Sequence, residues 1–407
     1  MAANSRDPTD SHTLPAYPFV MKYRWSLCNN LLSGITTPQF LKVLYRHRSA
    51  IAWTLYWHRI LFLFIISIPN TILGSVENWL FHDKIEAQVL HEEPIFVLGH
   101  PRTGTTLMQN LLCQDPNYIY VDTYQAGFPS AFLLTQKFNW ALSWLIDDTR
   151  PMDSMALSFE TPAEDEIAIN MLTSGISPYM CLTFMSKYKD SLKYATFEEG
   201  CADEEREAWQ EAFLYFLKKV TLSASGRKYG RGVSPKPLII KSPVHIGRLP
   251  IIYKLFPRAK FVFVHRDPVD VFLSSTILAQ EYFYYCFLDK PTAEDITNYT
   301  LEQHAKLYDV YLKERPKLLA SKSQVVAEVA FYELETDAVG TLREVYTKLN
   351  IAGFDERVAP ILQGYVEQLK GFKKNKLPNR SISAGLRERL KMELAPVMKA
   401  FNYTDTL

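Results

Sequence analysis

One stretch, residues 94–107, limits the possible folds of this chain more than any other feature. Charge-free apolar residues at 95–98 lead into a turn that contains Gly99 and Gly104, and a run typical of a helix follows at 107–112. A strand, a glycine turn and a helix in this order point backbone N–H groups and the helix N-terminus at an anion. The stretch therefore predicts a phosphate-binding loop.

The predicted loop differs from the P-loop of ATP- and GTP-binding proteins. Gly99 and Gly104 have the G-x4-G spacing of that motif, but Thr105 and Thr106 stand where it requires Lys and then Ser or Thr. The basic residue comes earlier, at Arg102. This arrangement favours a phosphate near the mouth of the loop over a triphosphate with magnesium.

A second candidate phosphate site follows the apolar run 260–264. Asp267 and Pro268 are typical of a helix N-cap and first turn. Arg266 then lies at the end of the strand, and Ser274 lies about two turns into the helix. An arginine fork binds phosphate through paired hydrogen bonds, and a serine hydroxyl adds a neutral donor. The alternative is a surface arginine and an ordinary helix serine.

These segments together resemble the sulfotransferases that use 3′-phosphoadenylyl sulfate (PAPS). Residues 101–106 match the 5′-phosphosulfate loop of that family, and Arg266 and Ser274 have the spacing of its 3′-phosphate pair. The resemblance implies PAPS as co-substrate without a metal. It assigns PAPS binding to a set of loop and helix residues: Arg102, Thr103, Gly104, Thr105, Thr106, Arg266, Ser274, and a basic loop with Lys373, Lys374 and Asn375.

Candidate catalytic residues follow a third apolar run, 237–240. Cytosolic sulfotransferases carry Lys-Thr-His at the end of the equivalent strand, whereas here Ser-Pro-Val separates Lys241 from His245. This spacing resembles a broader branch of the family found in bacteria and some eukaryotes. The resemblance implies that Lys241 stabilises the leaving group and that His245, or alternatively Glu166, deprotonates an acceptor hydroxyl. The acidic run around Glu166 also fits a plain helix start, with Thr161 and Glu164 as a capping box.

The composition excludes several classes of protein. The net charge of +1 over 407 residues argues against a nucleic-acid partner. The five cysteines are scattered and form no CxxC pair, so no zinc or redox motif is predicted.

An apolar segment at 60–76 leaves the relation to membranes open. It carries no charge, Pro69 interrupts it, and Trp53, Trp57 and Trp79 bracket it. Three interpretations remain: a buried core helix, an interfacial helix that makes peripheral membrane contact through 53–79, and a signal anchor. The first two fit a cytoplasmic protein, membrane-associated in the second case, and the third places the catalytic domain in the Golgi lumen.

The apolar runs alternate with helical patterns, which predicts an α/β fold with a P-loop-type, mostly parallel sheet flanked by helices. The expected strands are 95–98, 119–121, 238–240, 261–264 and 324–329. We expect an N-terminal helical extension at 1–85 and a sulfotransferase domain at 86–407.

The predicted activity is sulfuryl transfer from PAPS to a hydroxyl of a small-molecule or lipid-like acceptor. An aromatic cluster at 282–287, with Phe128 and Phe132, would wall an apolar acceptor tunnel, or else pack in the core. The alternatives are a nucleotide-dependent kinase or NTPase and a non-enzymatic membrane-associated binding protein. The oligomeric state stays open.

Overall fold

A five-stranded parallel sheet forms the centre of the protein. The computed structural model describes residues 17–198, 200–226, 234–321, 325–369 and 382–404. The strand order is β2-β3-β1-β4-β5, with all four pairings parallel. The strands are β1 (Ile95–Leu98), β2 (Ile119–Tyr120), β3 (Leu238–Lys241), β4 (Lys260–His265) and β5 (Val326–Ala330). The predicted α/β fold is therefore confirmed.

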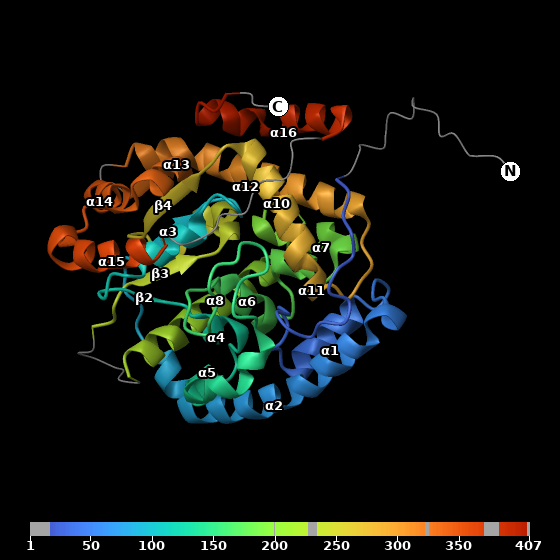
Figure 1. Ribbon diagram of the computed structural model, residues 1–407. Helices are drawn as coiled ribbons and strands as arrows, with labels where there is room; N and C mark the ends of the chain where they lie inside the picture. The colour runs from blue at the N-terminus through green and yellow to red at the C-terminus, as the bar shows by residue number, and fades with distance from the viewer. Residues whose placement is uncertain (1–16, 199, 227–233, 322–324, 370–381, 405–407) are drawn as a thin grey trace.

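Helices cover both faces of the sheet (Figure 1). The α-helices are α1 (Thr37–Arg46), α2 (Trp53–Glu86), α3 (Thr105–Leu112), α4 (Thr123–Gly127), α5 (Phe132–Thr135), α6 (Asp165–Leu172), α7 (Tyr188–Leu192), α8 (Asp203–Ala224), α9 (Leu249–Leu255), α10 (Pro268–Leu278), α11 (Tyr284–Cys286), α12 (Ala293–Leu319), α13 (Phe331–Thr336), α14 (Ala338–Lys348), α15 (Ala359–Leu369) and α16 (Ala384–Ala400).

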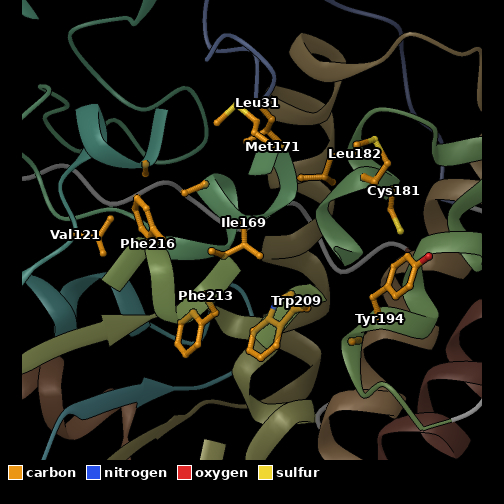
Figure 2. Packing of buried hydrophobic residues seen from close by; sticks show 14 of the residues in the cluster. Leu31, Val121, Ile169, Met171, Cys181, Leu182, Tyr194, Trp209, Phe213 and Phe216 are labelled. Atoms are coloured by element: carbon orange, nitrogen blue, oxygen red, sulfur yellow. The ribbon is translucent and has the colours of Figure 1, made fainter. Parts of the chain in front are cut away.

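Alternate residues of each strand enter two separate apolar cores, as the pleat of a strand requires. Phe96 and Ile240 point into the larger core, whereas Val97 and Ile239 point into the smaller one. The larger core contains apolar residues of α8, and Figure 2 shows Trp209, Phe213 and Phe216 around Ile169 of α6. Burial on both faces explains why the strands read as continuous apolar runs.

The register brings the carboxyl ends of three strands to one edge of the sheet. Val97 of β1 lies opposite Lys241 of β3, and Leu98 lies opposite Phe263 of β4. The three predicted motifs follow directly after these strand ends. Ligands of open parallel sheets bind at this edge, so the sheet gathers the motifs at one place.

The N-terminal region is dominated by α2, a helix of 34 residues that continues through Pro69. Its inner face contacts α1, α5 and α8. The buried Leu63 and Phe81 of α2 belong to the same apolar core as Phe96 of β1. The outer face of α2 lies at the edge of the molecule opposite α16 (Figure 1).

Candidate active site

The loop between β1 and α3 has the backbone of an anion cradle. α3 begins at Thr105, two residues earlier than its predicted start, so the N–H groups of Thr105 and Thr106 lie in its first turn. Gly104 has φ +100°, and a Cβ there would lie 2.2 Å from the ring of Phe331. Arg102 also adopts a positive φ, +75°, which a non-glycine residue rarely does. The loop therefore contains two residues in left-handed backbone conformations, Arg102 and Gly104.

The two predicted phosphate sites meet in the structure. Arg102 Nε donates a hydrogen bond of 3.0 Å to Ser274 Oγ. Arg266 lies over the ring of Phe331, 4.8 Å from its centre, and its guanidinium is 3.5 Å from the carboxylate of Asp270. The sheet therefore brings Arg102, Arg266 and Ser274 together, although they are far apart in the sequence.

Thr103 has a different position from the other predicted loop residues. It is fully buried, and its hydroxyl donates to the carbonyl of His100 at 2.9 Å. Its side chain therefore stabilises the turn. Lys373, Lys374 and Asn375, the predicted basic loop, lie outside the described residues.

Lys241 ends β3 at the centre of the site. Its side chain is 3% exposed, and its Nζ donates to Glu164 Oε1 at 2.7 Å and to Thr106 Oγ1 at 3.4 Å. Burial lowers the pKa of Lys241, and the charge of Glu164 opposes this shift. Lys241 thus links the phosphate loop to a carboxylate.

Glu164 receives hydrogen bonds on both carboxylate oxygens, from Lys241 and from the hydroxyl of Tyr179. Burial opposes its ionisation, but these two partners outweigh burial and lower the pKa of the Glu164 carboxyl. The predicted capping box is wrong, because α6 begins at Asp165 and Glu164 caps it without a side-chain hydrogen bond. The side chain is directed to Lys241 instead.

His245 and Glu166 are both fully buried and do not line the cavity around Lys241. His245 Nε2 lies 2.8 Å from Asp165 Oδ2, and its ring packs against Phe96. Ser242 donates to the other oxygen of Asp165 at 2.9 Å. These contacts join the segment after β3 to α6.

Glu166 forms a separate buried ion pair with Arg248, which donates to both carboxylate oxygens. Ser177 and Trp209 donate to the same carboxylate at 2.6 and 3.3 Å. The imidazole of His245 and the carboxylate of Glu166 are thus both held inside the core by partners of their own.

The sequence did not single out three residues that the structure places at the site, namely Glu164 beside Lys241, and Arg150 and Asp153 beside the phosphate loop. Glu164 lay in the acidic run that had drawn attention to Glu166, but a helix start offered a sufficient explanation for it. Arg150 and Asp153 belong to a loop without a recognisable motif. Asp153 Oδ2 accepts a hydrogen bond of 2.8 Å from Arg102, a contact that depends entirely on tertiary structure.

A cavity of about 1290 Å³ surrounds these groups. Its polar side is formed by the phosphate loop, Lys241 and Glu164. Its other lining is largely apolar, with Leu31, Phe128, Leu145, Ile146, Leu182, Tyr282 and Phe283 among its residues. Of the predicted aromatic wall, Phe128, Tyr282 and Phe283 line the cavity, whereas Phe132, Tyr284, Tyr285 and Phe287 do not and pack in the core.

The donor set fits a nucleotide with phosphate and sulfate groups. Arg102, Arg266 and Lys241 supply positive charge, and Ser274 and the first turn of α3 supply neutral donors. Across the described residues, His, Cys, Asp and Glu side chains form no group of three that could hold a metal ion.

The fold and the site define an enzyme that transfers a group from a nucleotide. A family model described as the sulfotransferase family matches residues 94–356. The chain belongs to this family, and the predicted class of enzyme, a PAPS-dependent sulfotransferase, is confirmed.

Mycobacterial sulfotransferases are similar to this chain. The omega-hydroxy-beta-dihydromenaquinone-9 sulfotransferase Stf3 of Mycobacterium bovis is 29% identical over 348 residues, which is 84% of each chain. The crystal structure of sulfotransferase STF1 from Mycobacterium tuberculosis has a TM-score of 0.60 at 16% identity, covering 88% of this chain and 92% of the other. STF9 from Mycobacterium avium has a TM-score of 0.59 at 18% identity, covering 91% and 88%.

Proposed function

We propose that this protein transfers the sulfuryl group of PAPS to the hydroxyl of a lipid-like alcohol at the cavity around Lys241. The observation that carries the proposal is the position of Lys241 Nζ between Thr106 of the phosphate loop and Glu164. The ammonium group is thereby placed between the donor site and the apolar part of the cavity.

The residues of the site have separate roles in an in-line transfer. Arg102, Arg266 and Ser274 bind the phosphates of the nucleotide, and Lys241 stabilises the negative charge that grows on the leaving phosphate oxygen. The acceptor oxygen forms a bond to sulfur while the bond from sulfur to the bridging oxygen breaks, and PAP (the desulfated product) leaves with the electron pair. We assign the uptake of the acceptor proton to Glu164, because this residue lines the cavity beside Lys241 and its lowered pKa keeps the carboxylate ionised and able to accept a proton.

The apolar lining supports a lipid-like acceptor. A carbohydrate would leave its hydroxyls without partners against side chains such as Leu31, Leu145 and Ile146. The mycobacterial relative is named for a menaquinone derivative with a terminal hydroxyl. We therefore propose an alcohol with a long apolar chain.

We further propose that the outer face of α2 lies on a membrane surface. By length and composition α2 is the one helix in the described ranges that could cross a bilayer. Its exposed side chains from residue 53 to 80 include no charged group. They include a set of large apolar residues, Trp53, Trp57, Leu61, Phe64, Ile65, Ile68, Ile72, Leu73, Val76, Trp79 and Leu80. A face of this kind with tryptophans at both ends is typical of interfacial helices.

The inner face of α2 supports surface contact over a membrane span. Arg59 is fully buried and donates to the carbonyl of Phe287 at 2.7 Å. Glu77 forms a buried ion pair with Lys219 of α8. A signal anchor would have to separate both charges from these partners and bury them in hydrocarbon. A cytoplasmic, membrane-associated protein is therefore the proposed form.

The active-site cavity adjoins this proposed membrane face. The 3-10 helix η1 (Gln136–Leu145) exposes Phe138, Trp140 and Trp144. Trp144 contacts Phe62 of α2 with the ring centres 6.0 Å apart, and Leu145, the next residue, lines the cavity. η1 therefore supplies both an apolar contact with α2 and an apolar residue of the cavity lining.

Vesicle sedimentation tests the membrane contact. Ile68→Glu and Ile72→Glu should each weaken binding to phosphatidylcholine vesicles about tenfold or more, since each replaces one buried apolar contact by a charge. The matched control is Met392→Glu on α16, where Met392 is 71% exposed at the opposite end of the molecule (Figure 1). Equal vesicle binding by the wild type and by all three variants would contradict the membrane contact.

Sulfuryl transfer is tested with labelled PAPS and an omega-hydroxylated dihydromenaquinone in vesicles. We expect label in the lipid, and a fall of about 100- to 10,000-fold for Glu164→Gln, which keeps the shape of the side chain but cannot take a proton. Transfer by Glu164→Gln at the wild-type rate would rule out Glu164 as the base.

A further inference from the structure

A short hairpin at residues 147–157 forms one side of the active-site cavity. Arg150 N donates to Met155 O at 2.8 Å, Leu157 N donates to Asp148 O at 2.9 Å, and Thr149 pairs with Ala156. Arg150 and Asp153 of this hairpin both line the cavity. The hairpin therefore holds a charged pair against the phosphate loop.

Two arginines converge on the carboxylate of Asp153. Arg102 Nη1 lies 2.8 Å from Asp153 Oδ2, and Arg150 Nη2 lies 3.4 Å from the same oxygen. Arg102 is bonded through Nε to Ser274 at 3.0 Å. The Asp153 carboxylate thus occupies a built anion site of two guanidinium groups next to a serine hydroxyl.

The chemistry of this anion site suits a phosphate better than a single carboxylate oxygen. Guanidinium groups bind phosphate and carboxylate through the same paired geometry, but a phosphate offers more acceptor oxygens and more charge. Arg102 belongs to the β1–α3 loop, where the backbone N–H groups of α3 also favour an anion. Asp153 therefore holds a position that a nucleotide phosphate would take.

Arg150 also lies close to the reacting groups. Its positive charge contributes to the lowered pKa values of both Lys241 and Glu164, after the larger effects of burial and of the Lys241–Glu164 pair. Both residues line the same cavity as Arg150.

We propose that Arg150 is a further nucleotide-binding residue and that Asp153 competes with a phosphate of the nucleotide for Arg102 and Arg150. The proposal rests on the proposed use of PAPS. Binding of the nucleotide breaks both ion pairs of Asp153 and transfers the two guanidinium groups to the phosphate. The positive charge of Arg150 then contributes to binding of the nucleotide phosphate.

Calorimetric titration with PAP tests the competition. Asp153→Asn keeps the shape of the side chain but removes its charge, so PAP should bind about tenfold more tightly than to the wild type. Arg150→Ala should bind PAP about tenfold more weakly or worse. The matched control is Asp148→Asn, an exposed residue of the same hairpin outside the cavity lining, which should bind as the wild type does.

The possible outcomes separate this proposal from the proposed function. If the wild type binds PAP but Asp153→Asn and Asp148→Asn have the same affinity, the competition is refuted while PAPS use stands. If Asp153→Asn binds PAP more weakly, Asp153 positions Arg150 for the nucleotide and does not compete with it, which also overturns the competition. An unchanged affinity of Arg150→Ala for PAP would show that Arg150 does not bind the nucleotide. Absence of PAP binding in every variant contradicts PAPS use and this proposal together.

Discussion

Lys241 combines two properties that a leaving-group stabiliser needs. It is buried, so its charge acts at low dielectric, and it is paired with Glu164, so the charge is held in place. The pKa of Lys241 is lowered by burial and that of Glu164 is lowered by its partners.

Replacement of Lys241 tests its proposed role as the stabiliser of the leaving group. Lys241→Ala should lower the single-turnover rate of sulfuryl transfer by about 100- to 1000-fold, as removal of one preorganised donor does. PAP binding, measured on the same preparation, controls for loss of fold. A variant with normal PAP binding and a normal rate would show that Lys241 is not the stabiliser.

His265, which ends β4 beside the phosphate site, should make the stability of the protein depend on pH. Its Nδ1 lies 2.8 Å from the hydroxyl of Tyr403, and its ring stacks on Phe401. Burial lowers the pKa of His265 to about 4, whereas a histidine of the unfolded chain titrates near about 6.5. Between these values the unfolded state binds more protons, so the free energy of unfolding falls as the pH decreases from about 6.5 to about 4.

Denaturant unfolding at several pH values measures this effect. In His265→Gln the slope of the free energy of unfolding against pH should be smaller by up to about 1.4 kcal/mol per pH unit in that window. Parallel curves for variant and wild type would mean that His265 keeps its ordinary pKa in the folded protein.

At the scale of elements, α2 and α8 are joined by a buried ion pair. Glu77 and Lys219 are each 1% exposed, and Leu134 N donates to Glu77 at 3.1 Å. Glu77→Ala should lower the free energy of unfolding by about 3–5 kcal/mol, because it leaves Lys219 buried without a counter-charge. The double variant Glu77→Leu with Lys219→Met should recover most of the loss. Denaturant unfolding of both variants checks this, and equal stability of Glu77→Ala and the wild type would contradict it.

The strands and the phosphate loop could be predicted because their signals are local. Apolar runs such as 95–98 and 238–240 reflect burial on both faces, and the turn before α3 needs glycine whatever surrounds it. The β5 prediction was close: 324 lies outside the described residues, and the observed strand is Val326–Ala330. The start of α6 was predicted too early because Thr161 and Glu164 have the spacing of a capping box, whereas the helix begins at Asp165.

The sequence could not show which of Glu164 and Glu166 lies beside Lys241. Glu164 and Glu166 are two positions apart at a helix start, so their side chains leave the helix in different directions. Only the position of Arg248 shows that Glu166 points into the core, and only the end of β3 shows that Glu164 points to Lys241. Such information resides in tertiary packing, as does the approach of Asp153 to Arg102.

At the scale of the whole molecule, the sheet edge places a group of cationic side chains beside a largely apolar cavity, and η1 contributes both Leu145 to the lining of that cavity and Trp144 to a contact with Phe62 of α2. The sequence left three interpretations for the apolar segment. The partners of Arg59 and Glu77 argue against the signal anchor, since both charges face the protein core.

The most direct test of the account is a thermal-shift titration of the purified protein with PAP, compared with ATP and magnesium. PAP at 100 times its dissociation constant should add about 2.7 kcal/mol of stability, and Arg266→Ala should lose this stabilisation. Two results would count against the account: stabilisation by ATP with magnesium alone, and no response to either nucleotide. Either result would contradict the assignment of a PAPS site to this edge of the sheet.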